Sequence, residues 1–187
     1  MGRWEPDAAG RLRVAALELF QSIGYEETTV AQIADRAGVT ARTFFRYFAD
    51  KPEVLFAGSE NLQIEMVAAV AAAAPDASPF AAIAAALDVG VGLIGQRSDY
   101  ARQRHGVVSS NPALAERELL KMARLANGLA AALRDRGTPE PQASLIAEAG
   151  VAAFRVGFAA WATQKRGPSL KERVEMNLEV LADLSRA

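Results

Sequence analysis

Apolar residues recur at three- and four-residue spacing along most of the chain, which is the pattern of helices that bury one face. Residues 7–23 show the pattern first. The predicted buried stripe of this helix is Leu12, Ala15, Ala16, Leu19, Phe20 and Ile23. Alternating apolar and polar runs, which would indicate strands, are nearly absent. We therefore predict an all-α protein.

Glycine, proline and serine-rich breaks divide the remaining pattern into segments of helix length. About nine helices are expected, and those after the first lie at residues 30–37, after Thr40, 52–74, 79–96, 99–109, 112–136, 142–166 and 170–185. We predict an N-terminal three-helix domain at residues 1–51. A helical bundle at residues 52–187 is expected to follow it.

Local signals between residues 29 and 50 predict a helix-turn-helix. Thr29 is a candidate N-cap, and Gln32 completes a capping box with it. Gly38 supplies a turn, Thr40 caps the next helix, and Asp50 caps the one after that. Two short helices joined by a tight glycine turn are typical of this motif.

In a helix-turn-helix the second helix enters the major groove of DNA, and its first residues touch base edges. Phe44 and Phe48 are four residues apart and should face the core. The predicted DNA-facing residues of this helix are Thr40, Ala41, Arg42, Thr43, Phe45, Arg46 and Tyr47. Arg42 can offer two donors to a guanine, a contact worth about 1–3 kcal/mol of discrimination. Thr40 and Thr43 can bind phosphate through their hydroxyls or touch a thymine methyl group.

Phosphate contacts are expected from three further groups. Thr29 can present its hydroxyl and a backbone amide at a helix start, Lys51 its ammonium, and Tyr47 its hydroxyl. The alternative interpretation makes Arg42 and Arg46 solvated surface charges and Tyr47 a packing residue.

The formal net charge of −1 means that any positive charge for DNA must be local. Arg3, in the arm at residues 2–4, is a candidate for the minor groove, and a frayed terminus is the alternative.

From residue 11 to residue 55 the chain resembles the DNA-binding region of the tetracycline-repressor (TetR) family of transcriptional regulators. The stretch that carries the resemblance is AALELFQSIGYEETTVAQIADRAGVTARTFFRYFADKPEVL. The resemblance implies a homodimer that binds a palindromic operator. It also implies a C-terminal domain whose ligand moves the two DNA-reading heads apart. Phe45 and Arg46 fill positions that vary in the family, so the resemblance does not imply an operator sequence.

The stretch RQRHGVVSSNPALAERELLKMARLANGLAAALRDRG resembles a TetR subgroup whose sensor domains receive acyl-CoA-like or other apolar ligands. Apolar linings with few polar groups are normal for small-molecule sites. The predicted ligand-binding residues are Leu87, Val91, Ile94, His105, Met122, Leu125, Phe154, Phe158 and Trp161. Arg102, Arg104 and Arg155 could join His105 at the polar end. The alternative for the single histidine is an ordinary packed or surface residue.

The last two predicted helices carry apolar stripes, which in the family form the dimer interface. Ordinary intramolecular core is the other interpretation of these stripes. Gly150 and Gly157 lie in the first of the two helices and would let another helix approach closely.

The sequence lacks the residues that several other kinds of site would need. The sequence has no cysteine and one histidine, so we expect no disulfide, no zinc site and no metal. No Glu-x-x-His pair and no Ser/His/Asp set can be nominated, so an enzyme is not expected. Residues 90–95 match G-x-G-x-x-G, but no βαβ unit surrounds them, and we expect no cofactor. The apolar runs are short and alanine-rich, so we expect a cytoplasmic protein with no membrane contact.

The predicted function is a ligand-responsive, DNA-binding transcriptional regulator, most simply a repressor. A small apolar or amphipathic molecule would release it from its operator. The alternatives are a constitutive DNA-binding or architectural protein without a ligand, and a helical-bundle enzyme.

Overall fold

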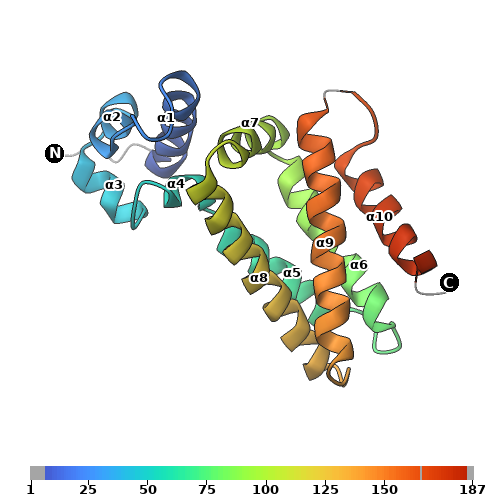
Figure 1. Cartoon of the computed structure of the whole chain (residues 1–187). Coiled ribbons are helices and arrows are strands. Elements are labelled where there is room, and N and C mark those ends of the chain that lie inside the picture. Colours follow the sequence, from blue (N-terminus) through green and yellow to red (C-terminus); the bar gives the residue numbers. More distant parts are fainter. Residues whose placement is uncertain (1–6, 165, 185–187) are drawn as a thin grey trace. The chain divides into compact units, whose positions relative to one another are not determined.

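A computed structural model gives the structure and describes residues 7–164 and 166–184 (Figure 1). Within these ranges every regular element is helical, which confirms the all-α prediction. The helices are α1 (Ala8–Ser22), α2 (Val30–Arg36), α3 (Ala41–Tyr47), α4 (Glu53–Phe56), α5 (Ser59–Ala72), α6 (Pro79–Gly95), α7 (Ser98–Ser109), α8 (Pro112–Asp135), α9 (Gln142–Thr163) and α10 (Leu170–Leu184).

The helix predicted at residues 52–74 is interrupted, and this prediction was wrong as one continuous element. The chain leaves the helical region at Ala57, where ψ is 128°, and Gly58 adopts a φ of 95°. A positive φ is easily reached only by glycine, so Gly58 ends the single turn α4 and starts α5. The described residues therefore hold one helix more than expected.

The N-terminal unit comprises residues up to 57 together with residues 107–115. Within it α1 packs against α2, α3 and α4. Its buried apolar side chains include Leu12, Ala16, Phe20, Ile33, Phe44, Phe48, Val54, Leu55, Phe56, Val108 and Leu114. The boundary predicted between residues 51 and 52 stays a prediction, whereas the contacts within the chain divide it after residue 57.

The caps that shape this unit form as the sequence indicated. Thr29 Oγ1 accepts a hydrogen bond from the Gln32 amide at 3.2 Å, and the Thr29 amide donates to Gln32 Oε1 at 2.8 Å. Thr40 Oγ1 accepts from the Thr43 amide at 3.2 Å. Gly38 turns the chain between α2 and α3 with a φ of 68°. Each cap satisfies a backbone N–H that the helix itself leaves unpaired.

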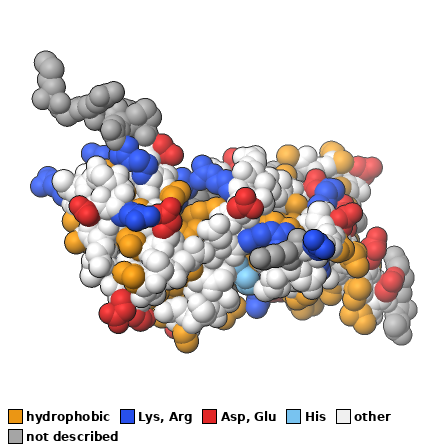
Figure 2. Space-filling view, turned by 90° about the horizontal axis from the view of Figure 1, so that it is seen from above, with side chains coloured by type: hydrophobic (Ala, Val, Ile, Leu, Met, Phe, Trp, Pro, Cys, Tyr) orange, Lys and Arg blue, Asp and Glu red, His pale blue; other side chains and the backbone are white. Residues whose placement is uncertain are grey.

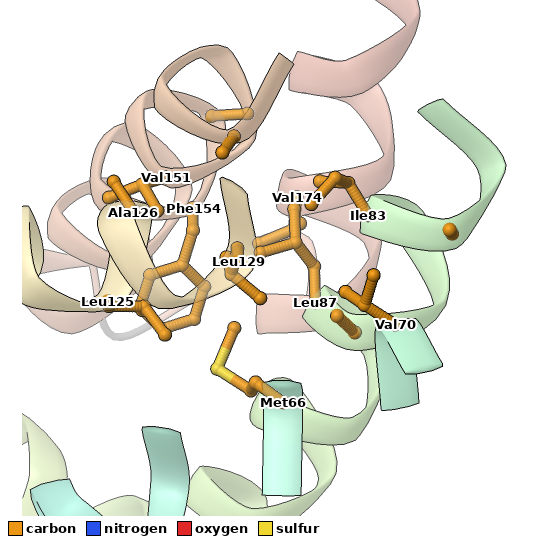
Figure 3. Packing of buried hydrophobic residues seen from close by; sticks show 14 of the residues in the cluster. Met66, Val70, Ile83, Leu87, Leu125, Ala126, Leu129, Val151, Phe154 and Val174 are labelled. Atoms are coloured by element: carbon orange, nitrogen blue, oxygen red, sulfur yellow. The ribbon is translucent and has the colours of Figure 1, made fainter. Parts of the chain in front are cut away.

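The C-terminal unit comprises residues 58–106 and the chain from 116 onward. Helix α9 packs along α10 and α6, and α5 packs along α6. Figure 3 shows the interior, where side chains from α5, α6, α8, α9 and α10 meet. Its fully or nearly fully buried members include Met66, Val70, Ile83, Leu87, Leu125, Leu129, Leu133, Val151, Phe154, Val174 and Leu178.

Three glycines of this unit allow neighbouring helices of the same chain to approach closely. A Cβ on Gly150 would lie 2.4 Å from Ile83 Cγ2 of α6, and one on Gly157 would lie 3.1 Å from Val174 Cγ2 of α10. The small face of α9 is therefore filled by its own chain. A Cβ on Gly90 would lie 2.8 Å from Met66 Sδ of α5, and the whole G-x-G-x-x-G run lies within helix α6.

Helix α9 is also, among the described residues, long and apolar enough to cross a membrane by length and composition, and the bent pair α6–α7 passes the same test when taken together. The core helix of a globular bundle has the same composition. Ala147, Val151, Phe154 and Trp161 of α9 are buried in the interior just described, which accounts for its apolar character.

Candidate nucleic-acid interface and effector site

Helix α3 has two chemically different faces. Phe44 and Phe48 are buried, as the four-residue spacing predicted. Their rings pack against each other with centroids 5.2 Å apart. The exposed residues of the helix are Ala41, Arg42, Phe45, Arg46 and Tyr47. The helix contains two arginines and no acidic residue, so its exposed face is cationic.

The exposed aromatic residues of α3 are held by their neighbours. Phe45 is 57% exposed, and its ring meets that of buried Phe44 edge to face, with centroids 5.5 Å apart. Tyr47 is 43% exposed. Arg46 donates from Nη2 to the Tyr47 hydroxyl at 3.1 Å, and its guanidinium carbon lies 4.9 Å from the centre of the Tyr47 ring. Tyr47 therefore presents a hydroxyl polarised by an adjacent cation.

The predicted threonines lie at the two helix starts. Thr29 and Thr40 are exposed N-caps, so their side chains mark the positive ends of α2 and α3. Thr43 is half-buried, and its hydroxyl is 3.0 Å from that of Thr40. The amides at these helix starts and the exposed threonine hydroxyls can both serve phosphate.

The Lys51 ammonium binds backbone carbonyl groups of its own chain. Its Nζ donates to the carbonyl oxygens of Tyr25 at 2.8 Å and Thr28 at 2.9 Å, with Glu26 O at 3.4 Å. It also sits 4.2 Å from the centre of the Tyr25 ring. The three N–H groups of the ammonium are equal in number to these three carbonyl acceptors. In this conformation Lys51 therefore stabilises the loop between α1 and α2. A role in DNA contact stays a prediction.

Nothing in the sequence pointed to this lysine contact, because its partners lie 23 to 26 residues earlier in a loop. Thr28, also in that loop, is buried and donates its hydroxyl to the Gly24 carbonyl at 2.7 Å. In the segment 107–115 of the same unit, Asn111 Nδ2 donates to Glu26 Oε1 at 3.2 Å. These contacts fix the chain that leads into the Thr29 cap.

Figure 2 shows lysine and arginine side chains spread among acidic ones on the face drawn, without a single large basic field. This agrees with the net charge of −1. The positive charge available for a polyanion is therefore local to elements such as α3. Arg3 and the arm at residues 2–4 lie outside the described residues.

Eight of the nine predicted effector residues belong to the C-terminal interior or pack against it. Leu87, Val91, Leu125, Phe154 and Trp161 are buried, while Ile94, Met122 and Phe158 are partly buried beside them. The aromatic rings of α9 form a row. Phe154 stacks on Phe158 with centroids 6.1 Å apart, and Phe158 lies 5.7 Å from Trp161.

His105, the ninth, adjoins this row from α7. Its ring meets Phe158 edge to face at 5.4 Å. Its Nδ1 is buried and has no hydrogen-bond partner. Burial lowers the pKa of His105 below its ordinary 6.5, with Glu118 opposing and Arg104 reinforcing the shift. The lowered pKa favours the neutral imidazole, which offers Nδ1 as one polar atom without a hydrogen-bond partner.

The arginines named for the polar end have different positions. Arg102 stacks 3.9 Å above the Trp161 ring and donates to the carbonyls of Trp161 and Gln164, the latter at 2.8 Å, so it caps the end of α9. Arg104 forms a half-buried ion pair with Glu118 of α8 at 2.7 Å. Arg155 is exposed. Of the three, Arg102 directly contacts a ring of the row.

The outer sides of α9 and α10 expose large apolar side chains. Val156 on α9 and Met176, Val180 and Leu184 on α10 are all more than half exposed. Residues Val174 and Leu178 of α10 face inward instead, so the apolar stripe predicted there divides between two faces. Val180 was not named from the sequence, although its four-residue spacing from Met176 could have identified it.

Residues 12–57 match the family described as "Bacterial regulatory proteins, tetR family". Over 79 residues the chain is 39% identical to the HTH-type transcriptional regulator TcmR of Streptomyces glaucescens, a match that covers 42% of this chain and 35% of TcmR. The chain thus spans about a third of the length of that curated relative.

Two solved structures resemble the whole chain. A TetR-family transcriptional regulator from Syntrophomonas wolfei has a TM-score of 0.71 at 18% identity, covering 97% of this chain and 96% of its own. The TetR-family repressor FadR of Thermus thermophilus, in complex with lauroyl-CoA, has a TM-score of 0.59 at 24% identity, covering 93% of each chain. These likenesses extend the shared fold through the C-terminal unit. Residues 12–57 therefore carry the DNA-binding segment of the TetR family of bacterial regulatory proteins, and the whole chain shares the fold of the two solved TetR-family structures.

Proposed function

We propose that this chain is a dimeric, ligand-responsive transcriptional repressor that binds a palindromic operator through α3. The observation that carries the proposal is that the Phe44 and Phe48 rings are buried while both arginines of α3 are exposed. Burial of the Phe44 and Phe48 rings leaves Arg42, Arg46 and Tyr47 exposed and available to a polyanion. An α-helix of this kind fits the major groove of B-DNA.

The DNA contacts we assign follow from the chemistry of each group. Arg42, near the start of α3, is placed to offer its two donors to a guanine edge. The Tyr47 hydroxyl and the capped starts of α2 and α3 would bind phosphates and set the register. Half-sites about one helical turn apart, or a little more, would then suit a two-fold symmetric pair of heads.

The dimer is proposed to form through the exposed apolar faces of α9 and α10. Val156, Met176, Val180 and Leu184 project from these helices without burial in their own chain. Exposed apolar area of this kind is typical of protein–protein interfaces. In a two-fold interface the same patch on each copy covers the other.

The effector is proposed to be a small apolar or amphipathic molecule, with an acyl-CoA as the first candidate because the related FadR structure holds lauroyl-CoA. We place its apolar part beside Phe154, Phe158 and Trp161 and a polar group at His105 Nδ1. A buried polar atom without a hydrogen-bond partner destabilises the protein. A ligand that forms a hydrogen bond with this atom removes that penalty, which adds to the binding free energy.

Coupling between ligand and DNA requires that the effector bind the released state better than the DNA-bound state. Helix α7 is the element we nominate for this coupling. Its residues 98–106, with His105, belong to the C-terminal unit, and the rest of the same helix belongs to the N-terminal unit. A displacement at His105 would be passed along the continuous backbone of that helix.

Selection of bound DNA from a random pool tests the DNA-binding proposal. The full-length protein should recover a palindrome. Recovery of unrelated sequences, or none, would contradict a sequence-specific regulator. The recovered operator then allows a second step, in which lauroyl-CoA is titrated into the complex.

Release of the operator at saturating lauroyl-CoA, weakened in His105→Leu, would support the effector site. Leucine keeps much of the volume of histidine and removes the polar atom. Operator binding that ignores lauroyl-CoA and other amphiphiles would favour a constitutive DNA-binding protein instead.

A further inference from the structure

Phe45 is the exposed feature of α3 that phosphate and hydrogen-bond chemistry does not explain. Its phenyl ring is 57% exposed, although the neighbouring Phe44 is completely buried. One side of the Phe45 ring meets Phe44 edge to face, with centroids 5.5 Å apart. Covering an exposed apolar ring of this size with a partner's apolar group is favourable.

Phe45 shares its side of the helix with the residues assigned to base contact. Ala41 and Arg42 precede it by four and three residues, which places all three on one face of α3. The ring has no donor or acceptor, so it cannot bind a phosphate or the polar edge of a base. The major groove presents one apolar group, the C5 methyl of thymine.

We propose that Phe45 reads a thymine in each operator half-site by packing its ring on the C5 methyl group. This inference rests on the proposed function, because it requires α3 to lie in the major groove. Three side chains of the helix then have different roles. Arg42 selects a guanine by hydrogen bonds, the Tyr47 hydroxyl binds the DNA phosphate backbone, and Phe45 selects thymine by apolar contact.

Replacement of thymine by deoxyuridine in the selected operator tests the contact, because deoxyuridine lacks only the methyl group and pairs normally. Each thymine of the half-site is replaced in turn, symmetrically in both halves. Burial of one methyl group corresponds to about fourfold in affinity per half-site. At one position we expect this loss for the wild type and for Phe45→Leu, which keeps an apolar side chain.

The same replacement measured with Phe45→Ala assigns the contact to this residue. Phe45→Ala should bind thymine and deoxyuridine operators equally at that position. Its folding is checked by helix content and by retained binding to unrelated DNA. A methyl effect that persists in Phe45→Ala would assign the thymine to another side chain, such as Ala41, and overturn the inference. Sequence-specific binding without any methyl effect would also overturn it but leave the proposed function standing, whereas failure of the selection itself would remove both.

Discussion

Replacement of Lys51 by methionine should destabilise the N-terminal unit, because the Lys51 side chain links the chain just before α4 to the loop before α2. Its ammonium donates to Tyr25 O and Thr28 O at 2.8 and 2.9 Å, and it lies on the Tyr25 ring. Methionine keeps the length and apolar stem of lysine but has no donor. The perturbation therefore removes the polar contacts and little of the packing.

The magnitude follows from the number and kind of these contacts. A hydrogen bond to a charged group contributes about 1.5–3 kcal/mol net, and an exposed cation–π contact about 0.5–1 kcal/mol. Because the carbonyls belong to a loop beside exposed Glu26 and Glu27, water can replace part of what is lost. We expect a loss of about 2 kcal/mol, which for a unit of this size lowers Tm by roughly 10 °C.

Amide hydrogen exchange measured by peptide is the appropriate assay, because two units need not unfold together. Peptides from α1 and α2 should exchange about 30-fold faster in Lys51→Met, the equivalent of 2 kcal/mol. Peptides from α6 and α9 should be unchanged. The matched control is Arg36→Met, which breaks an exposed ion pair with Glu18 and should cost less than about 1 kcal/mol.

Exchange in Lys51→Met that equals the Arg36→Met control would refute the view that this ammonium stabilises the loop. A role of Lys51 in phosphate binding is separable from stability by salt titration. Loss of one phosphate contact reduces the slope of log K against log salt by about 0.9. Operator binding by folded Lys51→Met with an unchanged slope would mean that the lysine acts on the loop alone.

Three further predictions follow from the described contacts. Thr40→Ala should destabilise the N-terminal unit by about 1 kcal/mol by removing the α3 cap, seen as faster exchange of the Thr43 amide, and exchange equal to wild type would contradict it. Val180→Glu should convert the proposed dimer to a monomer in a sedimentation experiment without loss of helix content, whereas the control Glu179→Gln should stay dimeric. A Val180→Glu protein that stays dimeric would contradict the assignment of α10 to the interface. Burial holds the pKa of His105 below 6.5, so this residue binds fewer protons in the folded than in the unfolded state and should reduce stability increasingly as the pH falls below 6.5. In His105→Gln the denaturant midpoint should therefore fall less between pH 7.5 and pH 5.5. A pH dependence equal to that of the wild type would contradict this prediction.

The sequence predicted most accurately what depends on short-range interactions. The Thr29–Gln32 box, the Thr40 cap and the Gly38 turn all join residues within a few positions, and the spacing of Phe44 and Phe48 sets their common face. Helix ends after residue 79 were predicted within three residues wherever the structure describes them. These features are encoded in local backbone chemistry, so periodicity and capping residues suffice to find them.

What the sequence did not reveal depends on partners far along the chain. Gly58 lies in a run that continues as helical periodicity on both sides, and a single glycine does not announce whether a helix bends or breaks there. Arg102 meets the end of α9 at a separation of 59 residues, and Lys51 meets a loop more than 20 residues earlier. A cation near a carbonyl end or an aromatic ring leaves no periodic trace, so only the folded chain shows such pairs.

The proposal that the exposed cationic residues of α3 read DNA while Phe44 and Phe48 pack in the core is tested most directly by Arg42→Ala. The dissociation constants of wild type and variant are measured on the selected operator and on an unrelated duplex of equal length, with exposed Arg36→Ala as a charge-matched control. We predict that Arg42→Ala loses about 1–3 kcal/mol on the operator, roughly 5- to 150-fold, and little on the unrelated duplex. An equal loss on both duplexes, or no loss on either, would contradict the assignment of this face to base recognition.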